Sequence, residues 1–127
     1  MEVTRWNVRS LPLNADDEEP AARVFFRPMP TGWQARIMEQ VQASAIEDGS
    51  TPQQAIDRLR EVAAAWHALH AEMLRDLVVR FDGVLVNGED ATRDQILAVL
   101  TEDEQQTAEL ARMIADESRV GARAGKR

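Results

Sequence analysis

The chain has 127 residues, of which 44% are apolar, enough for one domain with a buried core. Its formal net charge is −7, and residues 118–127 carry four basic side chains and no acidic one, so the rest of the chain carries −11. This acidic body argues against a nucleic-acid-binding surface, because phosphate contacts need clustered lysine and arginine. The absence of cysteine excludes disulfides and thiolate chemistry.

Membrane and export signals are not expected. No apolar run approaches the roughly 18 residues that a membrane-spanning helix needs. The first ten residues, MEVTRWNVRS, lack the basic segment followed by an apolar one that marks a secretory signal. A cytosolic protein is therefore the expectation.

The first 28 residues predict a small β element. Residues 3–9 alternate loosely between apolar and polar side chains, and residues 23–27 (RVFFR) form a compact apolar and aromatic segment. An acidic loop, NADDEEPA, separates them. The pattern predicts a β-hairpin or ribbon, which must pack on another element because two strands are marginally stable by themselves.

From Pro30 onward the sequence predicts four helices. Four sites have a threonine followed three residues later by Gln or Glu, the spacing of a capping box. They are Thr31/Gln34, Thr51/Gln54, Thr92/Gln95 and Thr101/Glu104. The helices that follow them are expected over residues 32–47, 52–80, 92–100 and 102–117.

The helix over 52–80 is long for so small a domain, roughly 43 Å at 1.5 Å per residue. Its apolar residues follow one another at alternating spacings of three and four, a heptad-like stripe. The stripe consists of Ile56, Leu59, Ala63, Trp66, His70, Met73 and Leu77. One end of this stripe is expected to extend past the core of its own subunit.

These elements predict a mainly α fold: a compact four-helix domain with one long helix and a small N-terminal β-hairpin or ribbon. Residues 1–117 would form a single domain. Residues 118–127 would form a basic flexible tail.

The stretch RFDGVLVNGEDATRDQI, residues 80–96, follows one predicted helix and leads into the next, and it holds Asp82, Asn87, Glu89, Asp90 and Asp94. A calcium-binding EF-hand loop started at Asp82 would need oxygen ligands where Val84 and Val86 stand, so calcium is not expected. Asn87-Gly88 favours a tight turn, because both residues tolerate positive φ. The acidic side chains are then solvated turn and first-turn residues.

No catalytic, cofactor or metal site is expected. His67 and His70 are three residues apart, but zinc needs further ligands that the sequence does not indicate. Nucleophile elbows, glycine-rich phosphate loops and HExxH motifs do not occur. The candidate functions are therefore those of a binding protein.

Six apolar residues are candidates for contact with a partner, on the argument that tryptophan and methionine suit adaptable interfaces. They are Trp6, Met38, Trp66, Met73, Leu77 and Leu110. All except Trp6 lie on predicted helix stripes, where they are equally good core residues. The residue pattern leaves groove and core open as alternatives.

The order of features resembles the tail assembly chaperones of long-tailed bacteriophages. The resemblance covers about residues 23–117. It depends on Arg27-Pro28-Met29-Pro30 before the first helix, on the connector VVRFDGVLVNGEDAT, and on the capped helix ATRDQILAVL after it.

The resemblance implies a non-enzymatic protein of the host bacterial cytoplasm, absent from the finished virion. It would bind the tape measure protein, and in some cases tail tube subunits, and keep them soluble until the tail polymerises. Self-association is compatible with the long helix. The alternatives left open are a structural tail or head–tail joining protein retained in the virion, and a small helical regulatory binding protein.

Many such chaperones are also made as a longer form by ribosomal frameshifting. Lys126, the only lysine, follows Ala124-Gly125, and a slippery run such as G GGA AAG could encode the three residues. The hypothesis is that the message, rather than the protein, requires this lysine. A lone lysine by chance is the alternative.

Overall fold

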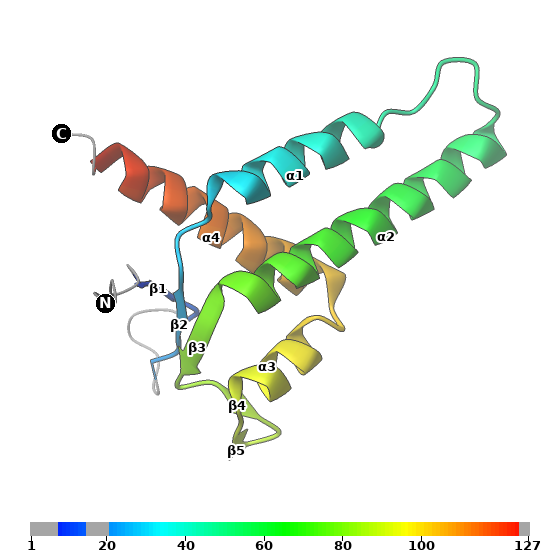
Figure 1. The fold of residues 1–127 in the computed structure, drawn as a ribbon. Coiled ribbons are helices and arrows are strands. Elements are labelled where there is room, and N and C mark those ends of the chain that lie inside the picture. Colours follow the sequence, from blue (N-terminus) through cyan, green and yellow to red (C-terminus); the bar gives the residue numbers. More distant parts are fainter. Residues whose placement is uncertain (1–7, 15–20, 125–127) are drawn as a thin grey trace.

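The computed structural model describes residues 8–14 and 21–124, and it confirms a mainly α fold of four helices with a small antiparallel sheet (Figure 1). The helices are α1 (Thr31–Ala43), α2 (Pro52–Leu77), α3 (Arg93–Leu100) and α4 (Glu104–Ala124). The strands are β1 (Arg9–Pro12), β2 (Arg23–Phe26), β3 (Val78–Asp82), β4 (Leu85–Val86) and β5 (Glu89–Asp90).

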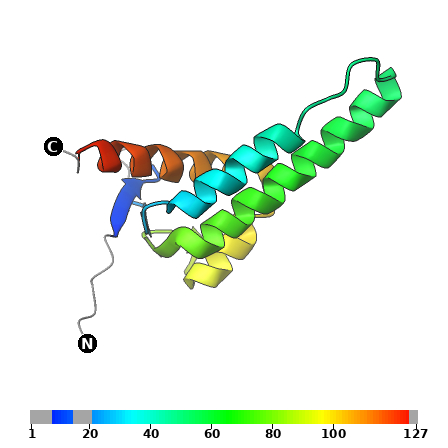
Figure 2. The same ribbon diagram turned by 45° about the horizontal axis from the view of Figure 1, so that its top comes forward.

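Helices α1 and α2 lie side by side and project together from the rest of the molecule (Figures 1 and 2). Helix α4 packs across the C-terminal half of α2, and α3 lies below that same half. The N-terminal half of α2, the end of α1 and the segment between them extend beyond both helices. We call this projecting part, residues 38–66, the arm.

The sheet has three strands in the order β1-β2-β3, all antiparallel. The N-terminal ribbon was predicted, but its first strand, expected over residues 3–9, is β1 at Arg9–Pro12, and residues 3–7 lie outside the described residues. The third strand was not predicted, because the second helix was expected to continue to residue 80. The helix instead ends at Leu77, and β3 begins at Val78 without a loop. Two β-branched valines at this point favour an extended chain, and β3 pairs with β2 from Arg23↔Asp82 to Phe26↔Val78.

The connector forms a second, two-stranded hairpin between β4 and β5. Its turn is Asn87-Gly88, with φ of 52° and 80°, which confirms the predicted tight turn. The acidic residues Glu89 and Asp90 lie exposed on β5. Helix α3 starts immediately after this hairpin.

Two of the four predicted capping boxes are present. At Thr51 and at Thr92 the side chain accepts the amide of the glutamine three residues later, and the glutamine side chain accepts the threonine amide. The other two predictions were wrong. Pro30 precedes α1 with no side-chain cap, and Thr101 ends α3 while Asp103 accepts the amide of Gln106 at 3.1 Å at the start of α4.

This difference predicts which threonines stabilise the fold. Thr51→Ala and Thr92→Ala are each expected to lower the free energy of unfolding by about 1 kcal/mol, because each leaves a helix N-terminal amide without its partner. Thr31→Ala is the matched control and should change it by a few tenths of a kcal/mol at most, since Thr31 caps nothing. Urea unfolding followed by circular dichroism measures all three; equal losses would contradict the assignment.

Two further helix ends, besides that of α2, differ from those predicted. Helix α1 stops at Ala43, four residues early, and α4 continues to Ala124, seven residues beyond the expected end at 117. Ser118, assigned to a flexible tail, is buried, and its hydroxyl accepts the backbone amide of Met29 at 2.9 Å. This contact places residue 118 within the fold. The remaining tail prediction concerns residues 125–127, which lie outside the described residues.

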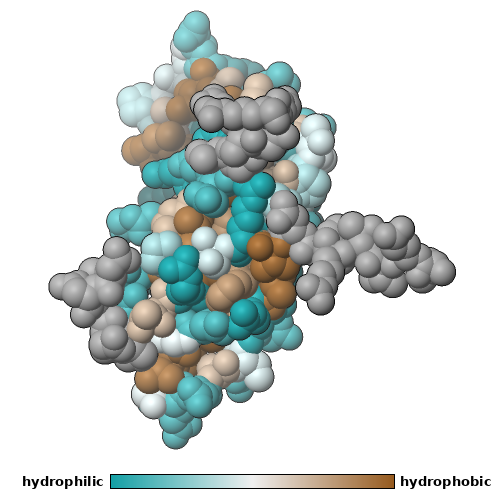
Figure 3. All heavy atoms as spheres, turned by 90° about the vertical axis from the view of Figure 1, so that its left-hand side faces the viewer, coloured by the Kyte–Doolittle hydropathy of each residue, from teal (hydrophilic) through white to brown (hydrophobic). Residues whose placement is uncertain are grey.

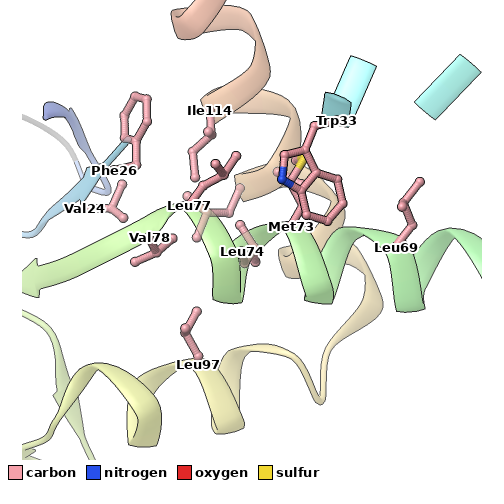
Figure 4. Close-up of a cluster of buried hydrophobic side chains, with 12 residues drawn as sticks. Val24, Phe26, Trp33, Leu69, Met73, Leu74, Leu77, Val78, Leu97 and Ile114 are labelled. Atoms are coloured by element: carbon pink, nitrogen blue, oxygen red, sulfur yellow. The ribbon is translucent and has the colours of Figure 1, made fainter. Parts of the chain in front are cut away.

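The core lies where the sheet, the C-terminal half of α2 and α4 meet (Figure 4). Val24 and Phe26 from β2 approach Leu77 of α2 and Ile114 of α4, and all four are almost fully buried. Leu97 adds α3 from the other side of α2. The arm extends beyond this core.

Candidate partner-binding surface

Three of the six candidate contact residues are core residues. Met73 and Leu77 are each 1% exposed and Leu110 is 4% exposed, so none can contact a partner in the folded protein. For these three, of the two alternatives that the sequence left open, the structure shows core rather than groove. The physical reason is that α4 covers the C-terminal half of the α2 stripe. Trp6 lies outside the described residues.

Trp66 is half-buried and joins the two helices of the arm. Its indole N–H donates a hydrogen bond to the Ser44 hydroxyl at 3.0 Å, just beyond the end of α1. The indole ring lies against His70, with ring centroids 5.4 Å apart. Trp66 also borders an open hollow of about 350 Å³, together with Ile37 of α1 and Ala108 and Ala111 of α4. Its ring therefore stands where the core ends and the arm begins.

Beyond Trp66 the same α2 stripe is exposed to solvent. Residues spaced three and four apart share one helix face, so Ile56 and Leu59 lie on the face that carries Met73 and Leu77 further along. Leu59 is 54% exposed, whereas Leu77 is buried. The stripe is thus core where α4 covers it and surface where α4 is absent. This confirms that one end of the stripe extends past the core.

The end of α1 adds to this exposed apolar surface. Met38 is 56% exposed, and Val41 lies three residues further along α1. Met38 also lines a hollow between α1 and α4 with Ile37 and Ala115. We define the arm surface as five exposed apolar residues: Met38, Val41, Ile46, Ile56 and Leu59.

The arm surface holds five of the ten large apolar residues exposed in the described part of the chain, within a span of 22 residues. At the opposite end of the molecule, apolar residues form separate small areas divided by hydrophilic ones (Figure 3). A local concentration of exposed apolar side chains marks an interaction surface. The length of the α2 stripe was the sequence signal for this surface. Four of its residues were not among the candidates: Val41, Ile46, Ile56 and Leu59.

The base of the arm is fixed by polar contacts between α1 and α2. The indole N–H of Trp33 donates to Asp76 at 2.6 Å, and Asp76 also forms an ion pair with Arg27 at 3.0 Å. One turn further, Arg36 binds both carboxylate oxygens of Glu72 and stacks over the Trp33 ring. The hydrogen bond from Arg36 lowers the pKa of Glu72. These contacts hold α1 alongside α2, with the two helices antiparallel.

A second set of contacts between α1 and α2 lies nearer the tip of the arm. The guanidinium of Arg58 donates to the Ala43 carbonyl, which belongs to the last turn of α1. The Ser44 hydroxyl donates to the Gln40 carbonyl at 2.6 Å while it accepts the bond from Trp66. Unpaired carbonyls at the end of α1 are thereby satisfied. The two helices of the arm are thus connected at two places, so the arm surface has a fixed position relative to the core.

His70 makes the stability of the base of the arm dependent on pH. Burial lowers the pKa of His70, and the positive charge of Arg112 on α4 lowers it further. The unfolded chain therefore binds a proton at a higher pH than the folded one does. Between the two pKa values the unfolded state carries more protons, so stability falls as the pH falls through the ordinary histidine range.

The prediction is that His70→Gln loses less stability than the wild type when the pH is lowered from about 7.5 to about 5. Urea unfolding at both pH values measures the two changes. An equal loss in both proteins would show that His70 does not carry the pH dependence.

Across residues 8–14 and 21–124, no three histidine, aspartate or glutamate side chains are grouped to hold a metal ion. Among the described residues the buried Nδ1 of His67 has no hydrogen-bond partner, and His67 and His70 do not form part of such a group. No helix in the same ranges is long and apolar enough to cross a membrane.

Comparison with known proteins gives no match: no family model, no curated protein and no solved structure is significantly similar to this chain.

Proposed function

We propose that this protein is a tail assembly chaperone that holds apolar helical segments of the tape measure protein on its arm surface. The observation that carries the proposal is the α2 stripe, which is covered by α4 in the core and bare along the arm. A client helix can occupy on the arm the face that α4 occupies in the core. Helix-in-groove packing of this kind is a common mode of peptide recognition.

Three further features support this proposal. The connector and capped helix, which carry the resemblance to tail assembly chaperones, are ordered as a tight hairpin followed by a helix. The arm surface is apolar and includes Met38, whose flexible side chain adapts to different partners. The acidic body, at −11 outside the last ten residues, favours solubility and attracts basic client segments.

The test is co-purification with the tape measure protein of the encoding phage. Leu59→Asp is expected to reduce the captured client at least about tenfold, because a carboxylate then meets the apolar client. Leu85→Asp is the matched control: Leu85 lies on β4, away from the arm, and is 49% exposed, close to the 54% of Leu59. It should leave capture unchanged.

Two results would contradict the proposal. Equal capture by both variants would place the client elsewhere, provided that circular dichroism shows both to be folded. Detection of the protein in purified virions by mass spectrometry, in amounts comparable with tail proteins, would favour a structural tail or head–tail joining protein instead.

A further inference from the structure

We infer that Asn87 is a site of spontaneous chemical modification, where water converts the side-chain amide to a carboxylate and the isoaspartate product loses the β4–β5 hairpin. Three features support this: the residue that follows Asn87, the exposure of the turn, and the contacts that the turn lacks. The hairpin lies away from the arm (Figure 1), so the reaction is independent of the proposed function.

The reaction begins when the backbone nitrogen of Gly88 attacks Cγ of the Asn87 side chain. As the new N–Cγ bond forms, this nitrogen loses its proton to solvent and the side-chain nitrogen leaves as ammonia, so a five-membered succinimide ring closes. Water then opens the ring at one of its two carbonyl carbons. Opening at Cγ gives aspartate, and opening at the main-chain carbon gives isoaspartate, in which the main chain runs through the side chain.

The glycine after Asn87 favours closure of this ring. Closure requires the peptide between the two residues to rotate out of the tight turn, and a residue without a Cβ permits this rotation. A Cβ at Gly88 would meet no atom within 4 Å, so the space around this residue is open. Asn87 is itself exposed.

Few contacts hold the turn closed. The hairpin has only two residue pairs, and residues 87–90 are all exposed. Across the ranges that the structure describes, neither the Asn87 side chain nor the Gly88 amide has a hydrogen-bond partner. A hollow of about 380 Å³ lies between the turn and Val99 of α3. A ribbon this short is only marginally stable, so the turn opens locally without unfolding of the core.

Asn14 provides a comparison within the same chain. Its side-chain oxygen accepts the backbone amide of Ala22 at 3.1 Å, and the next residue is Ala15, whose methyl group hinders ring closure. Of the three asparagines in the sequence, only Asn87 precedes a glycine. Asn7 lies outside the described residues.

Asp82 also precedes a glycine, and aspartate can form the same ring with loss of water. Its two carboxylate oxygens, however, accept hydrogen bonds from Arg80 at 2.6 and 2.8 Å. Gly83 lies against the Ala21 carbonyl, which restricts rotation of the peptide. Reaction at residue 82 is therefore expected to be slower than at residue 87.

The two products affect the hairpin differently. Aspartate before glycine favours the same tight turn, so this product keeps the hairpin and adds one negative charge beside Glu89 and Asp90. Isoaspartate adds one methylene group to the main chain. The two-residue turn then no longer brings the residue pairs of the hairpin into register.

The rate of reaction is measured by mass spectrometry on the full-length protein. Trypsin places Asn87 in the peptide 81–93 and Asn14 in the peptide 10–23, each with a single asparagine. The protein is kept at physiological temperature and mildly alkaline pH, where hydroxide removes the amide proton. The mass gain of an amide-to-acid exchange should appear at least about tenfold faster in 81–93 than in 10–23. Fragmentation should place isoaspartate at residue 87 and not at residue 82.

Asn87→Gly is the matched control. Gly-Gly favours the same type of turn, so the hairpin is kept while the reacting amide is removed. In the incubated wild type, the amides of residues 85–90 should exchange hydrogen at least about tenfold faster in the isoaspartate form than in the fresh protein. The variant should show no change after the same incubation, and unchanged exchange in α2 and α4 controls for unfolding of the core.

Each contrary result overturns the inference. Equal rates in the two peptides would mean that the turn does not favour reaction at Asn87. A rate in the folded protein more than about a hundredfold below that in urea would mean that the turn protects Asn87. Isoaspartate at residue 87 with unchanged hydrogen exchange in residues 85–90 would mean that the hairpin survives the modification.

Discussion

Leu77→Ala is expected to lower the free energy of unfolding by about 2–5 kcal/mol, whereas Leu59→Ala, the same change on the same stripe of α2, should alter it by less than about 0.5 kcal/mol. Leu77 is enclosed by Phe26, Ile114 and neighbouring core residues, so its removal leaves a cavity. Leu59 faces solvent, so its removal leaves none.

Urea unfolding of both variants, compared with the wild type at low protein concentration, measures the contrast. Similar losses for the two variants would mean that the arm packs on another part of the chain. A small loss at Leu77 would mean that the core is not where the sheet, α2 and α4 meet.

Gly83→Ala is expected to be the second most damaging change, with a loss of about 2–5 kcal/mol. Gly83 has φ of +71°, and a Cβ at this position would stand 2.2 Å from the carbonyl oxygen of Ala21. That oxygen belongs to backbone just before β2, so relief requires the sheet itself to shift. The same segment pairs with β3 through Arg23↔Asp82.

Gly88→Ala is the matched control. Gly88 also has positive φ, +80°, but a Cβ there would meet no atom within 4 Å. Only the conformational strain of about 1–2 kcal/mol is then expected. Thermal unfolding of the two variants separates the backbone strain of positive φ from the steric clash with Ala21. Equal shifts in Tm would show that the Ala21 carbonyl does not clash with a Cβ at residue 83.

Local signals predicted most of the fold. Apolar periodicity located all four helices, and the capping box at Thr51 predicted the start of α2 to the residue, while the one at Thr92 predicted the start of α3 to within one residue. The two wrong caps show the limit of the motif. A threonine at the correct spacing can end one helix, as Thr101 does after α3, while the neighbouring Asp103 begins the next.

Strand β3 could not be predicted in the same way. Its apolar residues continue directly from the α2 stripe, and its partner β2 lies more than fifty residues earlier in the chain. Val78 and Val79 favour an extended chain only weakly, so the tertiary pairing with Val24 and Phe26 decides between a strand and a last helical turn. Long-range pairing is the information that a local pattern lacks.

The exposed end of the α2 stripe was predicted, but three of the residues named as contact candidates are buried. Met73 and Leu77 follow the same apolar spacing along α2 as Ile56 and Leu59, so the stripe itself cannot indicate which half is covered. Coverage depends on where α4 crosses α2, and that crossing follows from the hairpin and α3 between them. Trp66 lies at this crossing, which explains its half-burial.

The pairing of β2 with β3 also constrains the order in which the chain can fold during synthesis. Arg23 meets Asp82, so the ribosome must make both α1 and α2 before the N-terminal ribbon gains its third strand. Until then the side chains of Val24 and Phe26 have no core to pack against, and a two-stranded ribbon is only marginally stable. Helices α1 and α2, whose contacts are closer in sequence, can form first. A nascent chain would thus present the arm before it has closed its core.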